Sequence, residues 1–259
     1  MTSTETPTNA SSPEAQARPM PRGRLWLLVA LGAVLFGILC GLGTWQVERL
    51  HWKETLLANI DARMHAAPTT LAGIAAIYDD SGDIDYWPVT VSGRFLHEDE
   101  RYFLATRDGE PGWDVYTPLL LDDSHAVFVN RGFVPDALRD PARRPEGQVE
   151  GDVTVTGLAR SVPHEKANMF VPDNAPEKNQ FFWRSLSDME KGLHLSPTVH
   201  IEPFFIDAGQ GAAPGGYPIG GATIVDIPNN HLQYAITWFG LAAVLLVMIG
   251  ALLIQQWRR

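Results

Sequence analysis

The chain has 259 residues, with 20 basic and 30 acidic side chains and one cysteine, Cys40. This length allows one or two domains, and a lone cysteine excludes a disulfide within the chain and a zinc or iron–sulfur site built from cysteines. Leaving out five arginines and two glutamates near the ends, the middle of the chain keeps 15 basic and 28 acidic residues, a net charge of −13. Such an acidic middle disfavours nucleic acid and anionic lipid as partners.

Two long uncharged stretches lie near the ends of the chain. Residues 25–47 and 232–257 are 23 and 26 residues without a charge. A bilayer core about 30 Å thick needs about 20 helical residues, so these stretches predict transmembrane helices over 25–47 and 231–257. Arginines flank their outer ends, namely Arg18, Arg22, Arg24, Arg258 and Arg259. By the positive-inside rule both termini are cytoplasmic, and residues 48–230 form a domain on the other side.

The N-terminal segment, residues 1–24, is rich in Ser, Thr, Pro and Ala, a composition that predicts a disordered cytoplasmic tail. It has too much acid and too little arginine for a mitochondrial transit peptide, and the apolar stretch after it is too long for a cleaved signal peptide. These features indicate a multi-pass protein of the bacterial inner membrane with a periplasmic middle domain. Residues 258–259 form a short cytoplasmic end.

The middle domain is predicted to consist mostly of short strands. The first helix is expected to continue over 46–64, where apolar residues recur on one face, and 79–83 is expected to be a loop. Alternation between turn signals predicts strands at residues 86–95, 101–106, 113–121, 125–130, 152–158 and 198–207. A short helix is expected within 185–193, irregular chain over 136–150 and a mobile loop over 209–221. The fold class is therefore two transmembrane α-helices flanking a mainly β, barrel-like, antiparallel domain with short helices.

Motifs of catalysis are missing from the sequence. It has no Gly-x-Ser-x-Gly elbow, no phosphate-binding glycine loop and no His-Glu-x-x-His pair. Its histidines are scattered along the chain. We therefore expect that the protein is not an enzyme.

One histidine stands where the chain enters the second apolar stretch. In residues 228–231 (PNNH) an Asn can cap the free N–H groups of the helix. Helical spacing then puts His231, Tyr234 and Trp238 along one face. Such a face could bind a metalloporphyrin, with the imidazole on the iron and the rings against the macrocycle. An interfacial cap with an aromatic belt fits the same residues, and both interpretations stay open.

The first apolar stretch contains a Gly-x-x-x-Gly pair, Gly37 and Gly41. Small residues at this spacing let another helix approach closely. The natural partner is the second span of the same chain, although a helix of another membrane protein could use the same face.

Five segments resemble the motifs of the Surfeit-locus (Shy-type) cytochrome c oxidase assembly factors, and they follow the order of that family over residues 42–240. They are residues 42–53 (LGTWQVERLHWK), 93–95 (GRF), 112–119 (GWDVYTPL), 129–135 (VNRGFVP) and 229–239 (NNHLQYAITWF). The first and last are specific. The chain departs from the family at Phe133, where Trp is more common, and over 172–183, where the match is loose. Neither departure touches the motif around His231.

The resemblance implies a bacterial member that helps to mature haem-copper cytochrome c oxidase. Members of the family help to deliver haem a to oxidase subunit I, and bacterial members bind haem a. The expected partners are therefore subunit I, the membrane and, as a further candidate, haem a synthase. One histidine ligand would also be easier to exchange than two, which suits a protein that releases its cargo.

The histidine that matches His231 is implicated in the family as a haem ligand. The candidate haem-binding residues are His231 at the iron, together with Tyr234, Trp238, Trp45, Arg49 and Lys53. Arg49 and Lys53 could pair with the haem propionates. Alternatively, both side chains extend from the helix end to the membrane surface.

Three functions remain open on this sequence. The first is a non-catalytic assembly factor that binds haem a and presents it to subunit I. The second is a scaffold that stabilises a subunit I intermediate and never carries haem. The third, a membrane-anchored periplasmic enzyme, is disfavoured by the missing catalytic motifs.

Overall fold

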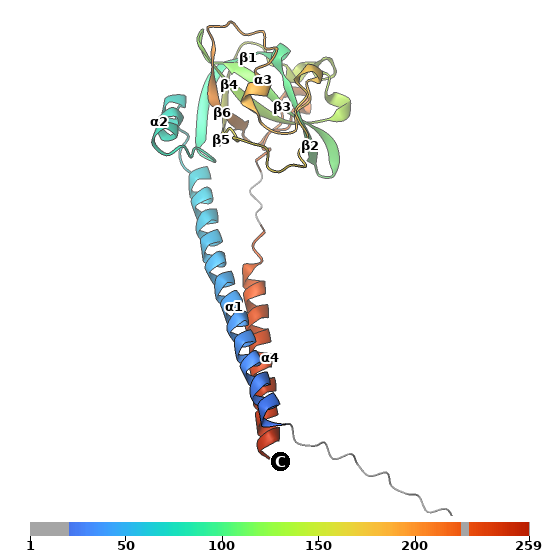
Figure 1. Ribbon diagram of the computed structural model, residues 1–259. Helices are drawn as coiled ribbons and strands as arrows, with labels where there is room; N and C mark the ends of the chain where they lie inside the picture. The colour runs from blue at the N-terminus through green and yellow to red at the C-terminus, as the bar shows by residue number, and fades with distance from the viewer. Residues whose placement is uncertain (1–20, 224–227, 259) are drawn as a thin grey trace, which may run out of the picture. The chain divides into compact units, whose positions relative to one another are not determined.

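The computed structural model describes residues 21–223 and 228–258 (Figure 1). These residues belong to two compact units, one made of residues 21–55 and 228–258 and the other of residues 56–223. We call the first unit the helix pair and the second the β domain. Most of the predicted disordered tail and Arg259 lie outside the described residues.

Two helices, α1 (Arg22–Met64) and α4 (His231–Trp257), form the helix pair, and the part of α1 after Thr55 belongs to the β domain. Both helices are long and apolar enough to cross a membrane by length and composition. The unbroken course of α1 to Met64 confirms the helix expected over 46–64. It begins three residues before the predicted span.

A seven-residue repeat on α1 forms the contact with α4. The buried positions of this repeat are Leu25, Gly32, Leu39 and Gln46. Residues spaced by seven return to the same side of a helix, as in a coiled-coil seam. A Cβ atom on Gly43 would lie 2.7 Å from the ring of Phe239, and one on Gly32 would collide with Ile249. Glycine at these two positions therefore permits the close approach of the helices.

The Gly-x-x-x-Gly pair does not make this contact. A Cβ atom on Gly37 or Gly41 would meet no described atom within 4 Å, and both residues are exposed. The interpretation that the pair receives the second span of the same chain is therefore wrong. Both glycines stand two residues from Leu39, about 200° around the helix from it. Their use by a helix of another protein stays a prediction.

The β domain is built on a six-stranded sheet. Its strands are β1 (Pro88–Phe95), β2 (Arg101–Arg107), β3 (Glu110–Leu120), β4 (His125–Pro135), β5 (Asp152–Ser161) and β6 (His200–Ala208). The strand order is β1-β5-β6-β4-β3-β2, and β1 also pairs with β3 through Phe95 and Leu119. Five strands therefore close into a small barrel, and β2 extends the sheet from the other half of β3 (Figure 1).

All six predicted strands are present, with ends shifted by up to five residues. The antiparallel expectation is wrong for one pair, because β4 and β6 run parallel, with Asn130 opposite Asp207. A parallel pair needs a crossover connection, and the chain between β4 and β6 supplies one that includes β5 and a long excursion over 162–199. The expected irregular chain over 136–150 contains three short 3₁₀ turns.

Two short helices complete the β domain. α3 (Leu186–Met189) confirms the helix expected within 185–193. α2 (Leu71–Ser81) was not predicted, and it corrects the loop expected over 79–83, which begins only at Gly82. The Thr70 side chain accepts a hydrogen bond from Gly73 N at 3.2 Å, and Gly82 ends the helix with φ +68°.

The interior of the barrel is apolar. Its main cluster of buried residues consists of Ile74, Ile84, Val89, Val91, Leu119, Val127, Val129, Ala159, Phe204 and Ile206. Ile74 comes from α2, which therefore covers part of the barrel core. A second cluster lies around Phe128, Phe181 and Phe205.

A bulge in β4 interrupts the alternation of side chains within the 129–135 motif. Val115 pairs with Gly132 and Tyr116 with Asn130, so Arg131 has no partner in the register. Gly132 has φ +110°, a value that favours glycine. Without this extra residue, neighbouring side chains would alternate strictly between the two faces of the sheet.

Candidate binding site at the helix pair

The first turn of α4 meets α1 through one polar contact. His231 Nδ1 lies 2.7 Å from Gln46 Oε1. Gln46 is only 8% exposed, and it continues the seven-residue repeat that packs α1 against α4. Glycine at position 43, one turn away on α1, allows the helices to come close enough for this contact.

The Gln46 oxygen determines which imidazole nitrogen carries the proton. A carbonyl oxygen can only accept, so His231 Nδ1 donates its N–H to Gln46 Oε1. In a neutral imidazole the other nitrogen, Nε2, then keeps its lone pair. Ligating histidines in metalloproteins are usually oriented by such a hydrogen bond from the second nitrogen. The contact therefore leaves Nε2 as the nitrogen of His231 that is free to accept.

Side-chain capping by Asn at the start of α4 differs from the expectation. The cap residue Asn230 makes no side-chain capping bond. Instead Asn229 Oδ1 accepts from His231 N at 3.5 Å, at the outer limit of a hydrogen bond. The backbone of Asn230 begins the helical pattern by accepting from Tyr234 N at 3.2 Å.

The two cationic candidates both have partners within the helix pair. Lys53, seven residues after Gln46, donates from Nζ to the carbonyl oxygen of Pro228. An ammonium group has three donors, so two remain for another acceptor. Arg49 stacks on Trp52, with its guanidinium carbon 3.7 Å from the ring centroid. Both cations thus lie within two turns of α1 from Gln46.

The aromatic candidates differ in exposure. Trp45 and Tyr234 are 54% and 53% exposed, and Trp238 is half-buried. His231, Trp238 and the buried Ala235 all fall on the side of α4 that faces α1, with Tyr234 at its flank. The structure therefore brings His231 and Trp238 together on one face, and it leaves large apolar surfaces of Trp45 and Tyr234 uncovered.

Gln46 is the site residue that sequence reasoning missed. It stands in the 42–53 motif beside Trp45, but an isolated glutamine in a helix carries no chemical signal. Its seven-residue distance from both Leu39 and Lys53 was the available clue.

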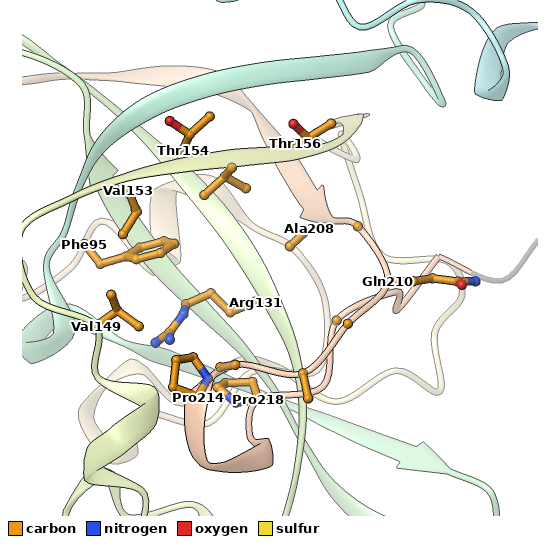
Figure 2. Close-up of a pocket in the computed structure, with 16 residues that line it drawn as sticks. Phe95, Arg131, Val149, Val153, Thr154, Thr156, Ala208, Gln210, Pro214 and Pro218 are labelled. Atoms are coloured by element: carbon orange, nitrogen blue, oxygen red, sulfur yellow. The ribbon is translucent and has the colours of Figure 1, made fainter.

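The β domain has its own cavity beside β1, β5 and the 209–221 loop (Figure 2). The cavity measures about 320 Å³, and its lining is mostly apolar, with Phe95, Val153 and Pro218 among the residues. Figure 2 shows Arg131 next to Phe95, and its guanidinium carbon lies 4.7 Å from the centroid of that ring. Among the described residues, Arg131 is the one charged side chain in this lining.

Arg131 is already engaged in a buried ion cluster. It donates to Glu100 Oε1 at 3.2 Å and to the carbonyl oxygen of Gly147. Arg144 also donates to both Glu100 oxygens, and Tyr102 donates to Oε2 at 2.8 Å. Burial opposes ionisation of Glu100, but hydrogen bonds from His97 and Arg144 and the charge of Arg144 together hold its pKa at about 2. We assign this cluster a structural role, because its charged groups bond to one another and to the backbone.

Residues 21–223 and 228–258 contain no group of three or more His, Cys, Asp or Glu that could hold a metal ion. A single imidazole such as His231 is outside that definition.

Comparison with known proteins covers both units. A model of the SURF1 family matches residues 33–243. The SURF1-like protein of Monosiga brevicollis is 37% identical, over 92% of this chain and 90% of its own length. Surfeit locus protein 1 of Mus musculus and of Homo sapiens are 38% and 37% identical, each over 84% of this chain and over 72% and 73% of their own lengths. The chain belongs to the SURF1 family.

Proposed function

We propose that this protein is an assembly factor for haem-copper cytochrome c oxidase, and that it binds haem a and assists its delivery to subunit I. Membership of the SURF1 family supports the role in oxidase assembly. The observation that carries the haem proposal is the hydrogen bond from His231 Nδ1 to Gln46 Oε1, because it leaves Nε2 as a free ligand.

In this proposal His231 Nε2 binds the haem iron. Trp238, Tyr234 and Trp45 pack on the macrocycle, because they offer exposed or half-exposed rings next to the histidine on two apolar helices. A hydrophobic cargo such as haem a is best held at such a surface, where apolar area leaves water on binding.

Arg49 and Lys53 pair with the two propionates. Lys53 keeps two ammonium donors beyond its bond to Pro228, and the Arg49 guanidinium keeps its charge while stacked on Trp52. Charge-assisted hydrogen bonds from such groups are the strong ones. One protein ligand at the iron, with propionates at the membrane surface, permits release to a recipient that supplies more ligands.

The setting is the inner membrane of a bacterium. Arginines at the outer ends of both spans favour cytoplasmic termini, so the β domain lies in the periplasm. The partners are oxidase subunit I and, for loading, haem a synthase. The protein is not catalytic in this scheme, because cargo transfer needs binding and exchange only.

The test is the absorption spectrum of the protein purified from cells that make haem a. We expect haem a in the wild type and a loss of at least about tenfold in occupancy in His231→Ala. His51→Ala is the matched control, because His51 is another histidine of the helix pair, on α1, and its side chain is 71% exposed. A protein free of haem that still supports oxidase assembly would favour the scaffold without cargo and overturn the haem proposal.

A further inference from the structure

A second cavity of the β domain is polar and belongs to no site described above. It measures about 240 Å³. Its lining residues are Tyr86, Asp114, Tyr116, Asn130, Arg160, Arg184, Asp207, Ala222 and Thr223. At about 30 Å³ for each water molecule, it holds roughly eight waters. This is room for a molecule the size of a free amino acid and far less than a nucleotide or a haem requires.

Two of the quoted sequence motifs meet in this cavity. Asp114 and Tyr116 come from the 112–119 segment, and Asn130 comes from the 129–135 segment. The buried Asn130 amide donates to Tyr116 Oη at 3.3 Å and to Asp207 Oδ1 at 3.1 Å, while its oxygen accepts from Gly132 N at 3.0 Å. The β4 bulge thus sets a fully bonded amide at the base of the cavity.

One wall is formed by a strained tyrosine and an arginine. Tyr86 has φ +69°. This backbone conformation is unfavourable for a residue with a large side chain, and residues held in it recur at functional sites. The Arg160 guanidinium carbon lies 4.4 Å from the centroid of the Tyr86 ring. Arg160 Nε is buried and has no hydrogen-bond partner among the described residues, since Asp85 and Asp207 stand 3.7 and 3.8 Å away.

Two opposite charges in the cavity form no ion pair among the described residues, although Arg184 hydrogen-bonds to Tyr116 and its guanidinium carbon lies 5.8 Å from the centroid of the Phe205 ring. Within residues 21–223 and 228–258, neither Asp114 nor Arg184 forms an ion pair with any charged side chain. The positive charges of Arg107 and, after it, Arg184 nevertheless act on Asp114. Burial, and after it the negative charge of Asp207, raise the pKa of Asp114 to about 6. A half-buried carboxyl without an ion pair costs stability, and such groups concentrate at functional sites.

The other two charged residues of the cavity, Asp207 and Arg160, offset each other's charge. Asp207 accepts from Asn130 and from Thr223 Oγ1, and its carboxylate also faces Arg160. Among the described residues, the Arg184 guanidinium and the Asp114 carboxyl lack an ion pair and Arg160 Nε lacks a hydrogen-bond acceptor. A ligand that satisfies both sides carries an anionic group and a cationic group within the span of a small molecule.

We propose that this cavity binds a zwitterion of amino-acid size, with its carboxylate on Arg184 and Arg160 Nε and its ammonium on Asp114. The proposal concerns the β domain alone and does not rest on haem binding. An anion without a cationic group would face Asp114 and Asp207 unshielded. A cation without an anionic group would leave Arg184 without a counter-charge and Arg160 Nε without a hydrogen-bond acceptor.

Titration calorimetry on the full-length protein in detergent tests the proposal at pH 7.5. The probes are glycine, β-alanine and 4-aminobutyrate, which vary the separation of the two charges, with acetate and methylammonium as single-charge controls. We expect saturable binding of at least one zwitterion, and binding of acetate and methylammonium at least about tenfold weaker. Asp114→Asn and Arg184→Gln should each weaken zwitterion binding at least about tenfold.

Two matched variants and a folding check complete the design. Asp123→Asn and Arg143→Gln make the same chemical changes at exposed residues outside the cavity and should leave the affinity within about twofold. Asp114→Asn should also raise the melting temperature, because it removes a buried charge, so its loss of binding cannot come from unfolding. Absence of binding by all three zwitterions would overturn the proposal. So would acetate bound as tightly as the zwitterions, or an unchanged affinity in Asp114→Asn.

Discussion

Glu100→Gln is the substitution whose effect on the β domain can be worked out most fully. The Glu100 side chain is 2% exposed and neutralises part of the charge of Arg131 and Arg144, which are 6% and 3% exposed. The glutamine keeps the shape but removes the charge. Two buried guanidinium groups would then lose their carboxylate, and breaking a buried ion pair from one side costs about 3–5 kcal/mol.

The pKa of Glu100 gives a second value for the free energy of unfolding that Glu100→Gln should lose. Its value falls from 4.5 to about 2 on folding, and each pKa unit corresponds to about 1.4 kcal/mol, so ionised Glu100 contributes about 3 kcal/mol. Because the folded-state pKa is lowered, this contribution is fully present above pH 4.5 and is lost as the pH falls towards 2. The difference between wild type and Glu100→Gln should therefore be constant from pH 8 to 6 and shrink below pH 4.5.

Urea unfolding of the full-length protein in detergent measures this difference. Tryptophan fluorescence reports on the region, since Trp113 is 7% exposed and donates from Nε1 to Asp136 at 2.7 Å. Glu98→Gln, two residues away and exposed, is the matched control and should stay within about 0.5 kcal/mol of wild type. A Glu100→Gln protein within about 1 kcal/mol of wild type at pH 7, or a difference that does not change between pH 6 and 3, would refute the reasoning.

Three further predictions concern both units. Gly43→Leu should force the helices apart and lower the haem content of the purified protein. Gly41→Leu projects into open space and should leave the haem content unchanged. Equal losses of haem in both variants would contradict the contact of Gly43 with α4. Gln46→Leu removes the acceptor of the His231 N–H and should weaken haem affinity about 10–100-fold in competition with apomyoglobin, while Gln46→Glu, which keeps an acceptor oxygen, should retain most of it. Asp114→Asn should stabilise the β domain by about 1–3 kcal/mol at pH 8 in urea unfolding, because a folded pKa of about 6 against 3.8 makes the ionised form unfavourable. That gain should disappear below about pH 4, and an unchanged stability at pH 8 would show that Asp114 is not strained by burial.

Long uncharged runs made the two helices predictable, because no short-range alternative exists for more than twenty uncharged residues. Alternation located all six strands for a similar local reason. The parallel pairing of β4 with β6 was out of reach, because it depends on how the chain after β5 returns to the sheet. α2 was missed because its N-cap residue, Thr70, precedes a segment that holds a glycine and ends in acids.

The candidate site was likewise only partly predictable from the sequence. His231 was predictable from its place at a helix start, and its position on α4 agrees with that expectation. Its partner Gln46 lies 185 residues away, and only the packing of α1 on α4 brings the two together. The Gly37–Gly41 interpretation failed because spacing defines a face but not its direction. The polar cavity likewise needs β3, β4, β5 and β6 in place before Asp114 and Arg160 become neighbours.

We propose that the first turn of α4 and the Gln46 turn of α1 hold haem through His231. Electron spin-echo measurements on the oxidised, haem-loaded protein with ¹⁵N-labelled histidine test it most directly, since they detect a histidine nitrogen bound to iron. We predict one histidine nitrogen coupled to the iron in wild type, its loss in His231→Ala and a return of coordination when imidazole is added to that variant. An unchanged histidine signal in His231→Ala would contradict the claim.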